Sequence, residues 1–323
     1  MTDRSSALAT AVFGTRDLEA ATRFYSDIIG FEVASEVTAT DTALTRHWHV
    51  PPGKTLRGAL LQANGNDIGQ ILLLEVDGGD VPALRSPEER AFVGLFNINL
   101  YVKDIRTTTD MLKREGFTPW ADPIIPAEVG PQGTTLELLF DGPDGVIINV
   151  VQLYGGDEDT VIGKLRADVE AVRFSARGST TVATTTHTVA DTHDAIAFYR
   201  TATGMQPILE LDVGSPEANR MMGRPEHGTS HVTLMSSKEL CGKVLCSHPT
   251  NYSVPNVTER TLLPGAGYWA HSFRIANVDK AIEATRAPVH SPANTVDVPG
   301  LGPRRAALVR CPGSGALTEL IED

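Results

Sequence analysis

The sequence predicts an α+β protein built from four tandem βαβββ modules. The first observation is a helix opening that recurs at Asp17, Asp104, Asp191 and Asn277, at intervals of 87, 87 and 86 residues. A near-constant period of this kind indicates an internal repeat. The second observation is the pattern that follows each opening, a helical stretch and then short β-branched runs bounded by Gly, Pro and Asp. Together they predict one supersecondary unit repeated four times.

The first repeat is the clearest. Residues 15–32 read TRDLEAATRFYSDIIGFE, and residues 189–206, VADTHDAIAFYRTATGMQ, keep the Asp, the Phe-Tyr pair and the Gly in register. Asp and Asn accept hydrogen bonds from the free N–H groups of a first helical turn, so all four opening residues are expected N-caps. Gly30, Gly116 and Gly204 suit the left-handed residue that ends a helix. This pattern predicts architecture, because the Phe-Tyr pairs are explained by core packing alone.

Strand patterns complete the modules. They place the four modules at about 8–76, 95–153, 179–250 and 267–323. An acidic, glycine-containing stretch at 155–159 is the expected boundary, and 161–174 carries one apolar face typical of a helix. We therefore expect an N-terminal domain at 1–156, a linker with a helix at 157–178 and a C-terminal domain at 179–323, each made of two consecutive modules.

Composition restricts the partners. The 323 residues carry a net charge of −12, which argues against nucleic acid or an anionic membrane as a binding surface. The N-terminal residues lack the apolar core of a signal peptide, and no apolar run reaches the length of a membrane span. Three cysteines without a CxxC pair are typical of reduced thiols. A cytoplasmic protein with a small-molecule ligand is expected.

Tandem units of this kind resemble the vicinal oxygen chelate superfamily, which includes glyoxalases, bleomycin-resistance proteins, epimerases and extradiol dioxygenases. The resemblance rests on the Asp17 and Asp191 segments and on GPDGVIINVVQ from Gly142, which is similar to the family's closing strand. It implies that two modules pair into one curved, mixed sheet around a cavity. Four modules then imply two such domains in one chain. The protein is expected to be either a monomer with the arrangement of a dimer (a pseudo-dimer) or a homodimer.

The resemblance also implies where site residues lie. Its first-strand position falls on Thr10, Asn97 and Thr184, with Ala270 in the fourth module, and its last-strand positions fall on Glu75, His248, Asn149 and Glu319. The expected N-terminal cavity thus holds Thr10, Glu75, Asn97 and Asn149. The expected C-terminal cavity holds Thr184, His248 and Glu319.

These sets favour chemistry without a metal. Ring cleavage by non-haem iron requires two histidines and a carboxylate on one face. Of the expected cavities only the C-terminal one holds two ligand types, His248 and Glu319, so no cofactor is assigned and a divalent metal on that pair stays an alternative. His271 lies one residue out of register, which in a strand places it on the opposite face unless a bulge intervenes. His248, Glu319 and the lone carboxylate Glu75 are the candidate acid–base residues.

Aromatic residues and further histidines are candidates for substrate contacts. His47 and His49 flank Trp48 and share one face of an expected strand, where they are either pocket residues or solvated side chains. Trp120, Trp269 and His271 are candidates for the cavity wall. Arg304 and Arg305 are candidates for an anionic substrate group, although exposed arginines are the commoner case.

The sequence therefore predicts an enzyme that acts on a small, partly apolar carbonyl or aromatic compound by proton transfer, as an isomerase or lyase. Sequestration of a small molecule without metal, as in resistance proteins, is the alternative, and a metal-dependent dioxygenase or glyoxalase using His248 and Glu319 is a second. The C-terminal domain is the expected working half, because it holds both of these residues. The N-terminal domain competes through Trp48 and its flanking histidines.

Overall fold

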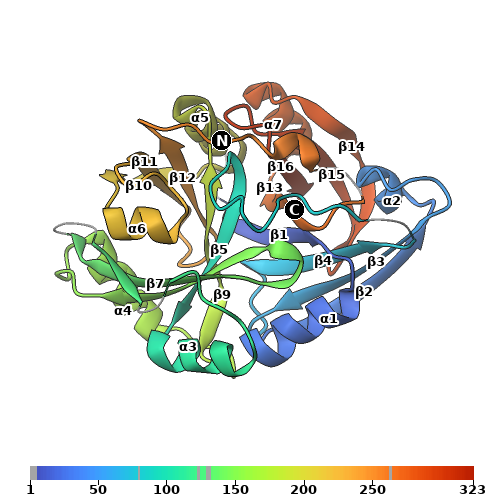
Figure 1. The fold of residues 1–323 in the computed structure, drawn as a ribbon. Helices are drawn as coiled ribbons and strands as arrows, with labels where there is room; N and C mark the ends of the chain where they lie inside the picture. Colours follow the sequence, from blue (N-terminus) through green and yellow to red (C-terminus); the bar gives the residue numbers. More distant parts are fainter. Residues whose placement is uncertain (1–5, 79–80, 122–123, 129–131, 262–263) are drawn as a thin grey trace.

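The computed structural model describes residues 6–323 except 79–80, 122–123, 129–131 and 262–263 (Figure 1). Four modules follow one another and the predicted βαβββ order is confirmed. Module 1 contains β1 (Leu8–Gly14), α1 (Leu18–Arg23), the π-helix η1 (Phe24–Ile29), β2 (Glu32–Thr40), α2 (Ala43–His47), β3 (Thr55–Gln62) and β4 (Gln70–Val76). Module 2 contains β5 (Gly94–Val102), α3 (Ile105–Arg114), β6 (Ile125–Glu128), β7 (Thr134–Asp141), the 3-10 turn η3 (Pro143–Gly145) and β8 (Ile147–Tyr154).

The helix α4 (Val161–Ala171) connects the halves of the chain. Module 3 contains β9 (Ser179–Thr188), α5 (Thr192–Thr203), β10 (Gln206–Val213), α6 (Pro216–Met221), β11 (Ser230–Ser236) and β12 (Lys243–Pro249). After the 3-10 turn η4 (Thr258–Arg260), module 4 contains β13 (Gly267–Ile275), α7 (Val278–Thr285), β14 (Val289–Val298), β15 (Gly302–Arg310) and β16 (Leu317–Glu322).

The repeated helix openings are N-caps, as predicted. The side chain of Asp17 accepts from the N–H of Ala20, and Asp104, Asp191 and Asn277 cap α3, α5 and α7 in the same way. Gly30 and Gly204 end their helices in the left-handed conformation, with φ of 92° and 75°. The local chemistry of each module is therefore the same, which explains why the four copies share a period.

The modules pair in an order that the sequence analysis did not predict. One eight-stranded sheet has the order β14-β15-β16-β13-β1-β4-β3-β2, and the other has β10-β11-β12-β9-β5-β8-β7-β6. Modules 1 and 4 thus form one sheet, called sheet 1/4 here, and modules 2 and 3 form sheet 2/3. The expected pairing of consecutive modules within 1–156 and 179–323 is wrong, because β1 pairs with β13 and β5 with β9.

Each sheet is curled, and its two faces have different neighbours (Figure 1). One face packs on the helices and on the other sheet in the large core around Phe13, Tyr199 and Phe273. The concave face of sheet 1/4 has its own cluster, which includes Trp48, Trp269 and residues of α2. Cavity residues must therefore come from modules 1 and 4 together, or from modules 2 and 3 together.

A buried hydrogen-bond network joins the two sheets. His187 Nδ1 lies 2.7 Å from the hydroxyl of Tyr199, which lies 3.1 Å from His271 Nδ1, and His271 Nε2 lies 3.1 Å from Thr185 Oγ1. Ser314 Oγ lies 2.6 Å from His187 Nε2. Thr185 donates its hydroxyl proton to the carbonyl of Asn97, so it accepts a hydrogen bond from Nε2 of His271. The remaining hydrogen bonds of the network then all run in one direction, which places the second ring proton on Nδ1 of His187. Both histidines are neutral in this arrangement.

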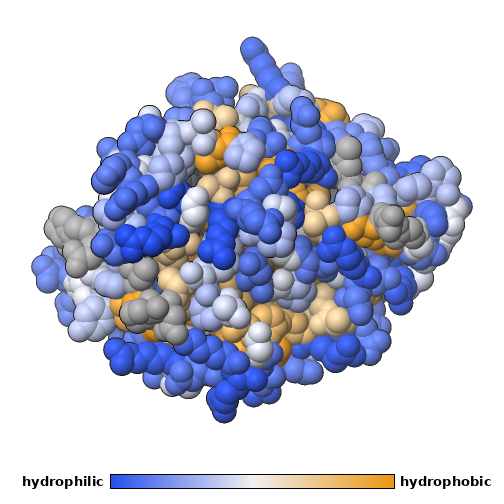
Figure 2. Space-filling model, in the orientation of Figure 1, coloured by the Kyte–Doolittle hydropathy of each residue, from blue (hydrophilic) through white to orange (hydrophobic). Residues whose placement is uncertain are grey.

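The outer surface is mainly hydrophilic on the side seen in Figure 2, where hydrophobic atoms gather in small separate patches. In the described part of the chain, no helix is long and apolar enough to cross a membrane.

Candidate active site

A row of polar residues crosses the centre of sheet 1/4 on its concave face. Thr10 of β1 pairs with Gln70 of β4 on one side and with Ser272 of β13 on the other. Ser272 in turn pairs with Glu319 of β16. Four neighbouring strands from both ends of the chain thus place a carboxylate, two hydroxyl groups and an amide side by side.

Glu319 is the only carboxylate of this row, and it is buried. The residue is 3% exposed, and its two carboxylate oxygens have different partners. The hydroxyl of Ser272 donates to Oε2 in a short hydrogen bond, and Nε2 of His47 lies 2.9 Å from Oε1. A carboxylate has about four acceptor positions, so each oxygen retains capacity for a ligand.

His47 reaches Glu319 from α2, which crosses the concave face. Thr42 caps this short helix by accepting from the N–H of Thr45, and the helix ends at His47. A helix, where the sequence analysis expected a strand, puts successive side chains about 100° apart. His47, the last residue of α2, is buried, whereas His49 lies beyond the helix with φ of 55° and is exposed, so the two do not share a face. His49 instead stacks on His290 with ring centroids 4.3 Å apart, and burial is the main cause that lowers the pKa of His290 to about 4.

A largely enclosed void of about 20 Å³ lies beside Glu319. It is lined by Thr10, Gln70, Ser272, Arg274 and Glu319, and its apolar wall is formed by Ala9, Leu60, Leu72, Val298, Pro299, Leu301 and Ile321. This volume holds about one water molecule. The turn between β14 and β15 closes the void, since a Cβ on Gly300 would lie 2.5 Å from Cδ2 of Leu60.

Among the described residues of sheet 1/4 and of the segment around α2, three buried side-chain nitrogen atoms have no hydrogen-bond partner. They are Nδ1 of His47 and the indole Nε1 atoms of Trp48 and Trp269. The rings form one group, with centroids 5.4 Å apart for His47 and Trp48 and 6.2 Å apart for Trp48 and Trp269. Folded cores rarely leave such groups unpaired. The concave face of sheet 1/4 therefore carries more hydrogen-bonding capacity than its own packing uses.

The donor set of this cavity does not fit a metal of the kind the resemblance implies. The row across the strands contributes one carboxylate and no histidine, and His47 already directs Nε2 at Glu319. A catalytic metal site needs about three protein ligands. Within the described ranges, the one group of three such side chains with ligand atoms within 4.8 Å of one another is Asp191, His193 and Asp194.

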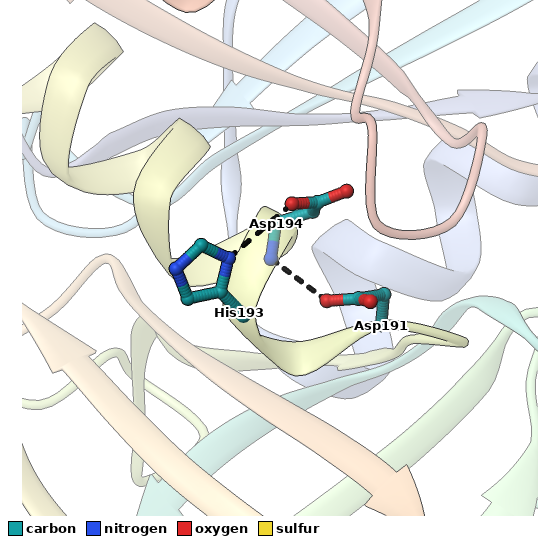
Figure 3. Close-up of side chains that lie close together, drawn as sticks. All are labelled: Asp191, His193 and Asp194. Atoms are coloured by element: carbon teal, nitrogen blue, oxygen red, sulfur yellow. Dashed lines mark hydrogen bonds and ion pairs between the residues drawn. The ribbon is translucent and has the colours of Figure 1, made fainter.

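That group is an exposed helix start (Figure 3). Asp191 accepts from the N–H of Asp194 at 2.9 Å as the N-cap of α5, and Nδ1 of His193 lies 3.4 Å from the carboxylate of Asp194. Exposed acidic groups of this kind are explained by capping alone.

Sheet 2/3 carries a different row at the equivalent positions. Asn149, Asn99, Thr184 and Lys243 lie on neighbouring strands there. Asn149 donates to Asn99 and to Glu137, both at 2.9 Å, and Asn97 donates to Asn99 at 3.3 Å. Burial lowers the pKa of Lys243 to about 8, and its ammonium group donates to backbone carbonyls. Side chains of α4 pack on the neighbouring part of this face with Tyr101 and Val151. The three amides are thus joined by hydrogen bonds, although Oδ1 of Asn149 is buried without a partner among the described residues.

Two predicted catalytic residues lie on the wrong face of their strands. Glu75 accepts from the N–H of Leu18 at 2.7 Å and pairs with Arg57, so it caps α1. His248 belongs to sheet 2/3, and its Nδ1 lies 3.1 Å from the carbonyl oxygen of Val189. Glu319 belongs to sheet 1/4. The predicted pair of His248 and Glu319 does not exist, and the metal alternative that used it falls with it. The cause is an error of one residue in β4 and β12, which reverses the face.

The remaining predicted contacts are divided between several places. His271 lies on the opposite face of β13, within the network that joins the sheets. Trp120 donates to Asp141 at 2.9 Å and carries Arg90 over its ring at 4.7 Å, near the outer part of sheet 2/3. Arg305 binds Asp279 through two hydrogen bonds at the surface. Thr10, His47, Trp48, Trp269 and Glu319 do gather in sheet 1/4.

A larger hollow of about 560 Å³ is open to solvent beside α1 and η1. Both arginines that line it are paired, Arg16 with Asp144 at 3.1 Å and Arg23 with Glu19. It lacks a buried reactive group.

Sequence reasoning missed Ser272, Gln70 and Arg274. Ser272 lies two residues from Ala270, the position that was considered, and therefore on the same face. Gln70 starts a strand that is apolar on both faces, so alternation gives no signal there.

Comparisons with known proteins agree with this fold. Residues 7–150 match the family model described as Glyoxalase/Bleomycin resistance protein/Dioxygenase superfamily. Glyoxalase I from Zea mays has a similar structure, with a TM-score of 0.63 and 16% identity over 98% of this chain and 92% of the maize chain. A candidate dioxygenase from Bacillus subtilis has a TM-score of 0.57 and 12% identity over 99% and 86% of the two chains. No curated protein matched in sequence. Residues 7–150 therefore match the Glyoxalase/Bleomycin resistance protein/Dioxygenase superfamily in sequence, and the chain as a whole shares the fold of these solved structures.

Proposed function

We propose that this chain is an enzyme that moves a proton on a small carbonyl compound in the cavity of sheet 1/4, with Glu319 as the base. One observation carries the proposal: a buried carboxylate, held by Ser272 and His47, lines an internal void together with hydroxyl and amide groups. Each oxygen of Glu319 has one partner and can accept a further hydrogen bond, so the carboxylate can still meet a ligand in the void.

The proposed step uses only residues of this chain. An oxygen of Glu319 takes a proton from the carbon next to the carbonyl group, and the C–H electron pair moves onto the carbonyl oxygen as an enolate. Thr10 and Gln70 lie across the row and supply a hydroxyl and an amide as donors to that oxygen. Where the α-carbon carries a hydroxyl group, Glu319 then returns the proton to the former carbonyl carbon while the hydroxyl proton moves to the enolate oxygen, which completes an isomerisation. In a lyase reaction the enolate collapses instead and a group on the β-carbon leaves with its electron pair, while Glu319 keeps the proton.

His47 and Ser272 have a positioning role in this proposal. Each donates to one oxygen of Glu319 and fixes the carboxylate plane relative to the void. Fixing a reacting group before the substrate arrives lowers the barrier, because less reorganisation remains. A metal is not part of the step, since the donor set does not fit one.

Entry of a substrate requires the turn between β14 and β15 to move away from Leu60, since the void holds about one water. The apolar wall and the small space favour a short compound.

Deuterium exchange tests the proposal. Two neutral probes, hydroxyacetone and pyruvamide, are incubated with the protein in D₂O, and loss of their α-proton signals is followed by NMR. Glu319→Gln keeps shape and should lower the catalysed rate about a hundredfold or more. Glu75→Gln is the matched control, a buried carboxylate of the same sheet that faces α1, and it should keep the rate. Equal rates for Glu319→Gln and the unaltered protein would refute the proposal, and binding without exchange would favour sequestration.

A further inference from the structure

We infer that the substrate of this site is a small carboxylic acid with a carbonyl group, and that Arg274 binds its carboxylate. The inference deepens the proposed function and rests on the same cavity. It starts from the charge of the void: of the described residues that line it, Arg274 is the only cation and Glu319 the only anion. These two groups define a polar axis, with a base at one end and an anion-binding group at the other.

The spacing along β13 and β16 sets the length of the ligand. Arg274 lies two residues after Ser272 on the same face, and it pairs with Ile321, two residues after Glu319. Two residues of a strand span about 7 Å. A carboxylate at the guanidinium group and an acidic C–H at Glu319 therefore fit one compound of a few carbons. The void holds about one water, so such a compound requires the turn between β14 and β15 to move, and a long-chain ligand would require a larger displacement.

Arg274 is available for this role because its present partner is weak. Its NH2 group lies 2.7 Å from a carboxylate oxygen of Asp67, whose side chain is 62% exposed. Exposed ion pairs contribute little, since water competes for both partners. The side chain of Arg274 itself is 25% exposed, so it lies at the border between void and solvent. A guanidinium group binds a carboxylate through two parallel hydrogen bonds, and it does so more strongly where water is excluded.

Net charge makes this local cation important. The chain carries −12 overall, so anions are repelled at long range. An anionic substrate consequently needs a cation within the pocket, and Arg274 supplies it. Arg305 on the neighbouring β15 cannot, because it is bound to Asp279 by two hydrogen bonds at the surface.

The test compares pyruvate with its neutral amide, pyruvamide, by calorimetric titration. The unaltered protein should bind pyruvate more tightly. Arg274→Met should lower pyruvate affinity about tenfold or more and leave pyruvamide affinity unchanged, whereas Arg274→Lys should retain part of the preference. Arg305→Met is the matched control and should change neither affinity. Thermal unfolding of each variant checks that it is folded.

The inference is overturned if the unaltered protein binds neither probe, if it shows no preference for the anion, or if Arg274→Met and Arg305→Met behave alike. Its failure is separable from that of the proposed function. Exchange of pyruvate protons that depends on Glu319 but is unchanged in Arg274→Met would retain the base and remove the carboxylate site. Pyruvate binding that depends on Arg274 without any proton exchange would retain the carboxylate site and remove Glu319 as the base.

Discussion

His47 and Glu319 lie at opposite ends of the chain, yet their Nε2 and Oε1 atoms are 2.9 Å apart in a buried pair. The contact exists because modules 1 and 4 share a sheet. We expect His47→Gln to weaken the hold on Glu319 and to lower the rate of deuterium exchange about tenfold while substrate affinity changes little. His248→Gln, which alters a histidine of sheet 2/3, should leave the rate unchanged. The relative exchange rates of the two variants measure this, and a larger loss in His248→Gln would place the working site in the other sheet.

The module pairing predicts how the chain behaves when it is cut. A protease site inserted at 155–159 separates modules 1 and 2 from modules 3 and 4. Because β1 pairs with β13 and β5 with β9, the two pieces should stay together after cleavage and elute as one species. Expressed alone, the 1–156 piece should lack a stable fold, since it exposes two unpaired strands. Two separate, folded pieces in size-exclusion chromatography and circular dichroism would contradict the pairing.

The network between the sheets predicts loss of stability in acid. Burial lowers the pKa of His187 from 6.5 to about 3, so above pH 6.5 the ring is neutral in both folded and unfolded chains. Below pH 6.5 the unfolded chain gains a proton that the folded one cannot, and stability falls until the pH reaches the folded pKa. At pH 5 this costs about 2 kcal/mol. Urea unfolding at pH 7.5 and pH 5 measures the change.

His187→Gln should reduce this acid sensitivity. His193→Gln, a change at an exposed histidine, should keep it. Equal pH dependence in both variants would show that the buried ring does not control acid stability.

The donor set of the cavity predicts independence from metals. Protein purified without chelator should contain well under one equivalent of iron, zinc, manganese or nickel by elemental analysis, and chelator should not reduce proton exchange. The physical reason is that Glu319 and His47 bind each other instead of leaving three ligands free for an ion. A stoichiometric metal that is lost in Glu319→Gln would contradict this.

Much of the fold was predictable because its signals are local. The caps at Asp17, Asp104, Asp191 and Asn277 and the glycines that end the helices depend on neighbouring residues alone. The pairing of modules was not predictable, because four similar units offer similar strand edges and the choice among them depends on long-range packing. Sequence order alone favours the pairing of consecutive modules.

Site residues were predictable where a polar side chain stands out in a stretch of apolar sequence. Glu319 and the segment around Trp48 are such cases, although His47 was expected on a strand and lies at the end of a helix. Glu75 and His248 were placed wrongly, because β4 is apolar on both faces and its alternation cannot be read. The apolar run ILLLEV does not reveal that Glu75 faces α1.

Changing the equivalent positions of the two sheets distinguishes a working site in sheet 1/4, with Glu319 as its base, from one in sheet 2/3. Glu319→Gln alters sheet 1/4, and Asn149→Ala alters the matching position of sheet 2/3. Proton exchange of the same neutral probe is measured for both variants under identical conditions. We expect a loss of about a hundredfold or more for Glu319→Gln and a rate close to that of the unaltered protein for Asn149→Ala. A full rate in Glu319→Gln together with a lost rate in Asn149→Ala would contradict this expectation.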